Sequence, residues 1–195
     1  MMLEFLRLGK PVRIFVVTIG DAYCDACSFW KNVGIEPVMQ KWAQCSEAEL
    51  AEFATIRKGE TTSGQQVQLA APGQKLEPGI WLAGGGRHLT LGGPTRLDLP
   101  PGGPAEIHCP SGNPLFASLA KHLGAQAAGV ILTGMGDDGT TGLLALKQAG
   151  GTTVVQDEAS CLIFGMPKAA QEKGAAGHVL NIAGIVKALE QMARS

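Results

Sequence analysis

Two adjacent carboxylates, Asp137 and Asp138, stand in the part of the sequence that is richest in residues able to do chemistry. They follow an apolar run that predicts a buried strand and precede a segment with helical periodicity. In open α/β sheets, ligands and catalytic groups gather at the carboxyl ends of the strands. A carboxylate there can orient a histidine and stabilise its charged form, as the acid of a nucleophile, base and acid triad. The residues that would form the turn on the oxyanion side of such a site are Gly134, Met135, Gly136 and Gly139.

The same turn permits two other interpretations. Its glycines can simply let the chain turn while an aspartate caps the following helix. The spacing Gly134-x-Gly136-x-x-Gly139 also matches a dinucleotide fingerprint, with Asp157 and Glu158 near the distance expected for a ribose-binding acid. The two carboxylates oppose this last interpretation, because they would stand where a pyrophosphate needs backbone N–H groups and no negative charge.

A triad also needs a nucleophile and a base, and the sequence offers one candidate for each. Cys24 follows the first predicted strand and could act as a thiolate, while His88 could act as the base. The structural alternative is a small buried cysteine and a hydrogen-bonded histidine. Cys24-Asp-Ala-Cys27 has the spacing of a redox pair, but no second cysteine pair accompanies it to make a zinc site. We therefore expect no metal and no cofactor.

The second half of the chain alternates predicted strands and helices at short loop lengths. We expect strands at 128–133, 152–155 and 179–180, and helices at 114–124, 140–148, 167–173 and 182–193. This alternation is typical of βαβ units on a parallel sheet. The predicted fold class is α/β, a doubly wound and mostly parallel sheet with helices on both faces and a short antiparallel hairpin.

The first half has weaker signals, and its predicted elements are short. They are a strand at 12–19, a helix at about 47–57 after a capping box, and strands at 67–69, 78–83 and from 87. Glutamines alternate with Val67 and Leu69, so we expect this strand to be exposed or at an edge and to pair antiparallel. Six prolines between positions 94 and 114 predict a loop.

Composition limits the class of protein. The chain has 195 residues, with 16 Lys and Arg against 17 Asp and Glu and no basic block, which argues against nucleic acid as the main partner. No apolar run approaches the roughly 18 residues that span a bilayer, so we expect no membrane insertion. The beginning of the sequence lacks a signal core, and five irregularly spaced cysteines do not form a secreted disulfide framework. We therefore expect a cytoplasmic protein with reduced thiols.

Several segments together resemble the C-terminal methylesterase domain of the chemotaxis protein CheB. The likeness runs from about 78 to 182, and its motifs lie at 129–139, Gly142-Leu, 149–151, 156–160 and 164–170. The segment 78–88 resembles the family's strand and turn that end in a histidine, with Gly84 where the family usually has proline. His108-Cys-Pro-Ser111 resembles the family's His-Arg-Pro-Ser loop, with the arginine lost.

The resemblance implies a doubly wound α/β domain that hydrolyses methyl esters of glutamate on chemoreceptors with a serine, histidine and aspartate triad. Asp138 matches the triad aspartate. The family's serine stands in a Gly-Ala-Ser-Thr-Gly-Gly turn after the first strand, and Ala22 falls near that position here. The family's base has no counterpart, because no histidine precedes His88.

The incomplete triad leaves three hypotheses. The first is a protein-glutamate methylesterase, or a related carboxylic ester hydrolase, whose partner is a methylated chemoreceptor or another chemosensory protein. The second is a degenerate domain of the same family that regulates signalling by docking, and the third is a dinucleotide-binding module. We expect a single domain over 1–195 without a receiver domain, since about 11 residues before the first predicted strand are too few for one. The oligomeric state is not predicted.

Overall fold

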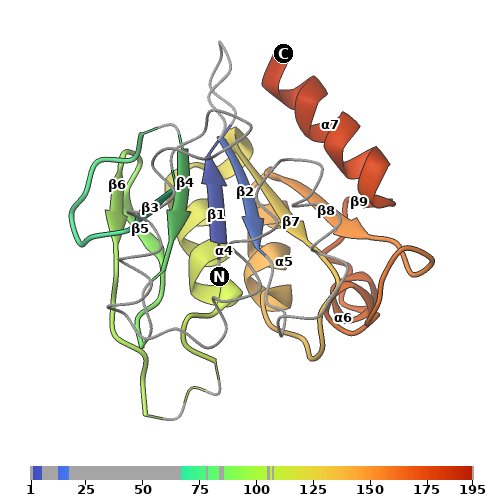
Figure 1. Cartoon of the computed structure of the whole chain (residues 1–195), viewed down its shortest axis with the longest axis horizontal. Coiled ribbons are helices and arrows are strands. Elements are labelled where there is room, and N and C mark those ends of the chain that lie inside the picture. Colours follow the sequence, from blue (N-terminus) through green and yellow to red (C-terminus); the bar gives the residue numbers. More distant parts are fainter. Residues whose placement is uncertain are drawn as a thin grey trace.

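A parallel sheet of four strands forms the centre of the molecule (Figure 1). The computed structural model describes residues 2–5, 13–17, 67–77, 79–83, 86–104, 106 and 108–194. The strands of this sheet, in spatial order, are β2 (Arg13–Val17), β7 (Ala127–Ile131), β8 (Thr152–Gln156) and β9 (His178–Leu180). Every residue of β7 is buried, as expected for a central strand covered on both faces. The predicted α/β class is confirmed.

Helices follow or precede the strands of this sheet. They are α4 (Gly112–His122), α5 (Thr140–Gln148), α6 (Met166–Glu172) and α7 (Ile182–Arg194), with a short 3₁₀ turn, η2 (Gly124–Gln126), before β7. α5 connects β7 to β8 and α6 connects β8 to β9, which gives the βαβ alternation predicted from the sequence. α4 packs against α5 and β7, whereas α7 packs against β8 and β9.

Two smaller sheets lie beside the parallel one. The first has the order β1 (Met2–Phe5), β4 (Gly79–Leu82) and β3 (Val67–Leu69), and the second is the hairpin of β5 (Thr90–Gly93) and β6 (Arg96–Asp98). The antiparallel hairpin confirms that part of the predicted fold class. Leu89, Leu91 and Leu97 are buried, so the hairpin closes one side of the core around Trp81 and Phe116.

Two predictions for this region were wrong. β3 pairs with β4 in parallel rather than antiparallel, and the antiparallel neighbour of β4 is β1. The segment between β3 and β4 is hydrogen-bonded to the β6 region, where Gly73 donates to Leu97 and Leu76 donates to Thr95, and the chain returns so that both strands run in the same direction. The predicted loop at 94–114 contains β6, because its prolines flank the Arg96–Asp98 segment and none interrupts it.

Cys161 is only partly buried, and its neighbours Leu162 and Ile163 are exposed. The backbone of Ile163, between β8 and α6, is hydrogen-bonded to Thr133 and Gly134, while the side chains of Leu162 and Ile163 are exposed. Among the described helices, none is long and apolar enough to cross a membrane. The predicted helix at 47–57 and residues Ala22, Cys24 and Cys27 lie outside the described residues.

Candidate active site at the amino-terminal end of α4

Asp138 lies in the loop that leads from the carboxyl end of β7 into α5, as predicted. The side chain is buried, with only 4% of the residue exposed. Its neighbour Asp137 is exposed and lies 3.7 Å from the Lys173 ammonium group. Gly139, with a φ of 82°, follows as the N-cap of α5, in a backbone conformation that favours glycine. The two carboxylates therefore have different surroundings, and only that of Asp138 is enclosed.

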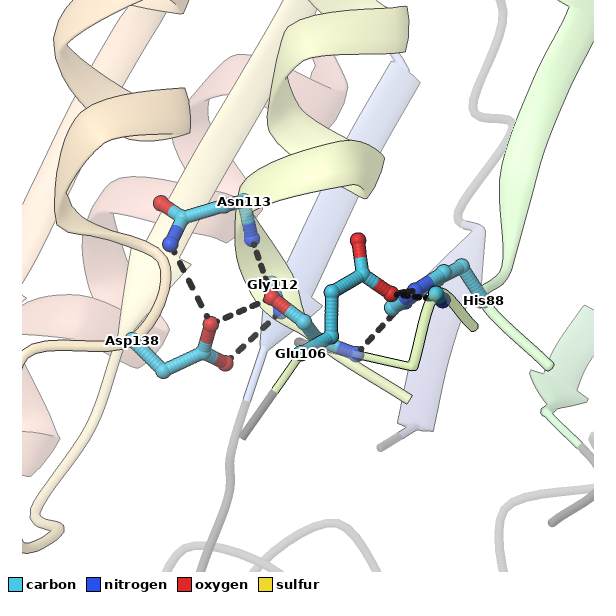
Figure 2. Close-up of polar contacts among 7 residues, drawn as sticks. His88, Glu106, Gly112, Asn113 and Asp138 are labelled. Atoms are coloured by element: carbon cyan, nitrogen blue, oxygen red, sulfur yellow. Dashed lines mark hydrogen bonds and ion pairs between the residues drawn. The ribbon is translucent and has the colours of Figure 1, made fainter. Parts of the chain in front are cut away.

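Three donors hold the Asp138 carboxylate, and all of them come from the beginning of α4 (Figure 2). The Ser111 hydroxyl donates to Oδ1 at 2.5 Å, and the Asn113 side-chain amide donates to the same oxygen at 3.3 Å. The backbone N–H of Gly112 donates to Oδ2 at 2.7 Å. A carboxylate near the amino-terminal end of a helix is also favoured by the helix dipole.

Ser111 explains why α4 begins where it does. It is the N-cap residue, with extended backbone angles, and its hydroxyl oxygen accepts from the backbone N–H of Asn113 at 3.2 Å. Pro114 occupies the first turn, where a missing N–H costs nothing. The sequence placed the helix start at Pro114, so the N-cap serine and the first two helical residues were missed.

Asn113 links the beginnings of α4 and α5. Its side-chain oxygen accepts from the backbone N–H of Gly142 at 3.0 Å, while its amide nitrogen reaches Asp138. A Cβ at position 142 would lie 2.4 Å from the Asn113 carbonyl oxygen, so the two helices approach as closely as glycine allows. Asp138 is thus held between two helices in direct contact.

Ser111 contacts Asp138 through its hydroxyl and His88 through its backbone N–H, and Figure 2 shows His88 well separated from Asp138. His88 is 3% exposed, and its Nδ1 accepts from the backbone N–H of Ser111 at 3.1 Å. Its Nε2 lies 2.6 Å from a carboxylate oxygen of Glu106, which also accepts from the backbone N–H of Gly103. These two hydrogen bonds, that from His88 first, hold the pKa of Glu106 below its ordinary value. No hydrogen bond joins His88 to Asp138 within the described residues.

A cavity of about 540 Å³ opens beside this cluster. Its polar lining includes Asp138, Ser111, Asn113, Glu106 and His108, and its apolar lining includes Pro114, Ala117 and Ala145. Among the described residues, no group of three or more His, Cys, Asp or Glu side chains is placed to hold a metal ion. The cavity combines an apolar wall with a buried carboxylate and a nearby imidazole, which are features of a small-molecule or side-chain site.

The loop after β7 is fastened to the segment before α6. The backbone N–H of Gly134 donates to Ile163, and the N–H groups of Gly165 and Met166 donate to the Gly134 carbonyl. Met135 projects from this junction with 76% of its surface exposed. Both carboxylates remain beside the Gly134-x-Gly136-x-x-Gly139 turn, so the charge argument against a pyrophosphate holds in the folded chain.

Comparison with known proteins identifies the family. The protein-family model described as CheB methylesterase matches residues 40–189 of this chain. The chain belongs to the CheB methylesterase family. The CheB methylesterase catalytic domain of Thermotoga maritima, known from a crystal structure, superposes with a TM-score of 0.62 and 29% identity, covering 73% of this chain and 75% of that one.

Curated relatives of the CheB family are also similar in sequence. A protein from Leptospira interrogans serogroup Icterohaemorrhagiae serovar copenhageni, named protein-glutamate methylesterase/protein-glutamine glutaminase 3, is 37% identical over 182 residues. The match covers 91% of this chain and 48% of that protein. A protein of Anaeromyxobacter dehalogenans with the same name but numbered 2 is 45% identical over 131 residues, covering 66% of this chain and 38% of that protein. The chain spans about half the length of the first of these relatives.

The structure brings some of the predicted site residues of this CheB-family chain together. Asp138 and the glycines of its loop lie at the carboxyl end of the central strand β7, whereas His88 contacts Ser111. Sequence reasoning missed Ser111, Asn113 and Glu106 as partners within the cluster. A serine three residues before a proline that starts a helical pattern is an N-cap signal, and it could have found Ser111.

Proposed function

We propose that this chain hydrolyses methyl esters of glutamate side chains in proteins, with Asp138 as the acid of a catalytic triad. The observation that carries the proposal is the buried Asp138 carboxylate, held by three donors at the carboxyl end of β7 and lining the cavity. A carboxylate has about four acceptor sites, so one remains for an imidazole N–H. Membership of the CheB family supports the same reaction.

The described histidines differ in how well they could serve as the base. Both ring nitrogens of His88 are engaged, and the ring is buried. His108 is exposed and lines the cavity together with Asp138, so we assign it the role of base. Cys24, which lies outside the described residues, is the proposed nucleophile.

The reaction follows the general course of acyl transfer. The base removes the proton from the nucleophile, which attacks the ester carbonyl and forms an acyl-enzyme. The proton passes from the base to the departing methoxide, and methanol leaves. Water activated by the same base then hydrolyses the acyl-enzyme and restores the glutamate carboxylate. Asp138 stabilises the charged imidazole at both stages.

The protein substrate follows from the same proposal. The curated relatives are named for action on protein glutamate and protein glutamine. We infer that the partner of this chain is a methylated chemoreceptor or another chemosensory protein, encountered in the cytoplasm. A side-chain ester presented by such a partner fits a cavity that has both an apolar wall and polar groups.

Methanol release from methylated receptor membranes tests the proposal. The wild-type chain is compared with Asp138→Ala, His108→Gln and Cys24→Ala, each shown by circular dichroism to be folded. We expect release by the wild type and its loss in Asp138→Ala, His108→Gln and Cys24→Ala. Unchanged turnover in folded Asp138→Ala would contradict the role of Asp138, and background release by the folded wild type would contradict the activity itself.

A second candidate function has one specific observation in its favour. Every donor found on Asp138 belongs to the beginning of α4, which is also what a purely structural carboxylate cap would show. A degenerate CheB-type domain that regulates by docking would keep this contact for stability. In that case methylated receptor membranes would bind the chain without methanol release, and Asp138→Ala would lower stability while a folded fraction still bound.

A further inference from the structure

His88 is a buried histidine that the triad does not use. It belongs to the segment before β5, where its own backbone N–H donates to Pro100. Its side chain reaches Ser111, the N-cap residue of α4, 23 positions later in the sequence. Burial of an imidazole requires partners for both ring nitrogens. Ser111 and Glu106 supply these partners.

The partners determine where the proton of the ring lies. Nδ1 faces a backbone N–H, which can only donate, so Nδ1 carries the lone pair. The proton is therefore on Nε2, where it is donated to the Glu106 carboxylate. Glu106 in turn is oriented by the backbone N–H of Gly103 at 2.7 Å. The ring thus presents a fixed acceptor to the N-cap residue of α4.

Ser111 connects His88 to the carboxylate of Asp138. Its backbone N–H is fixed by His88, its hydroxyl donates to one oxygen of Asp138, and the next amide donates to the other oxygen. A rotation of the Ser111 backbone would displace both donors at once. Displacements of about 1 Å in a catalytic group can cost on the order of 10²-fold in rate.

We propose that His88 is a positioning residue for Asp138, acting through its Nδ1 acceptor and the backbone of Ser111. The proposal rests on the proposed esterase function only for its catalytic readout. It differs from a role of His88 as the base, because a positioning acceptor needs no titratable group. A neutral side chain with an oxygen in the place of Nδ1 should therefore suffice.

Two substitutions separate these roles. His88→Asn places an amide oxygen the same number of bonds from Cβ as Nδ1, and this oxygen can accept from Ser111 without being able to act as a base. His88→Ala removes the acceptor. His178→Asn is the matched control, because His178 is exposed at the edge strand β9 and distant in sequence from the cluster. All three are compared with the wild type in the full chain.

Kinetics give the first readout. We expect His88→Ala to lower kcat for methanol release by about 10-fold or more with little change in KM, since the donors on Asp138 shift while substrate contacts remain. His88→Asn should restore most of the lost kcat, and His178→Asn should match the wild type. An Asn variant as slow as the Ala variant would overturn the positioning role.

Amide hydrogen exchange gives a readout that does not depend on turnover. In His88→Ala, the amides of Ser111 and Gly112 should exchange faster than in the wild type, while those of α7 should not change; His88→Asn should restore the protection. Nitrogen NMR of the wild-type imidazole should show the proton on Nε2. Unchanged amide exchange in His88→Ala would overturn the positioning role of His88, even if the wild type proves inactive. If the exchange changes occur but the wild type releases no methanol, only the esterase proposal is contradicted.

Discussion

The Ser111 hydroxyl donates a hydrogen bond to Oδ1 of Asp138, joining the N-cap of α4 to the loop between β7 and α5. The two residues are 27 positions apart in the sequence, and both are buried. Ser111 also accepts from the N–H of Asn113, so one hydroxyl group closes the helix end and holds the carboxylate. Stability and the orientation of the proposed catalytic acid are therefore coupled at this contact.

A double-mutant cycle should measure this coupling. Removing a hydrogen bond to a charged group costs about 1.5–3 kcal/mol, and removing an N-cap serine costs about 1 kcal/mol. We expect Ser111→Ala to lower the free energy of unfolding by about 2.5–4 kcal/mol. The double variant with Asp138→Ala should cost less than the sum of the single variants by about 1.5–3 kcal/mol, measured by urea denaturation. A coupling energy near zero would show that the contact contributes nothing.

Asn113→Asp tests the second donor on Asp138. The new side chain keeps an oxygen that accepts from the Gly142 N–H. Its second carboxylate oxygen takes the place of Nδ2, which lies 3.3 Å from Oδ1 of Asp138 in the wild type. Two carboxylates this close repel each other, so we expect stability at pH 7 to fall by at least about 1 kcal/mol. Adding Asp138→Asn should recover part of the loss. A variant as stable as the wild type would mean that Asn113 does not contact Asp138 in solution.

Gly142→Ala tests the close approach of α4 and α5. The added methyl group would lie 2.4 Å from the Asn113 carbonyl oxygen and 2.9 Å from its Cα, and neither backbone atom can move without shifting α4. We expect a loss of about 3 kcal/mol or more in unfolding free energy, at the upper end of the range for overpacking. Gly93→Ala, whose Cβ would meet nothing within 4 Å, is the control and should change stability little.

The His88 and Glu106 pair predicts a pH dependence. The pKa of Glu106 is lowered in the folded chain, chiefly by the hydrogen bond from His88, so folding favours the ionised carboxylate. The stabilisation is present above the ordinary carboxyl value of 4.5 and is lost as pH falls through the lower folded pKa. Glu106→Gln should therefore lower Tm at pH 7, and the difference from the wild type should shrink below pH 4.5.

Thermal melts of the wild type and of Glu106→Gln between pH 7 and 3 check this expectation. Glu158→Gln, which removes one exposed carboxylate outside the pair, corrects for the general effect of charge. A difference in Tm that grows on acidification would reverse the expected sign and contradict the geometry of the pair.

Much of the second half of the chain was predictable because its signals are local. The alternation of apolar strands with helical periodicity located β8, α5, α6 and α7 within one or two residues. The turn at Asp138 was also correctly placed, since an apolar run, a glycine-rich turn and a periodic segment follow one another directly.

The remainder depends on contacts between distant segments. The parallel pairing of β3 with β4 accompanies hydrogen bonds from the 73–76 turn to the segment around β6, and no local pattern reveals either. The hydrogen-bond partners of Asp138 stand at the beginning of α4, and those of His88 are Ser111 and Glu106. A sequence pattern indicates which residue types can do chemistry, but tertiary packing decides which of them meet.

The order of strands in the parallel sheet has a consequence for how the chain folds. β7, β8 and β9 are neighbours both in the sheet and along the sequence, so each pairing closes a short loop. β2 instead pairs with β7, and Arg13 lies opposite Ala127 from the other half of the molecule. Closing so long a loop is slow compared with forming the local units. During synthesis, the apolar segment of β2 leaves the ribosome long before its partner exists, which makes it the stretch of the sheet most in need of protection from aggregation.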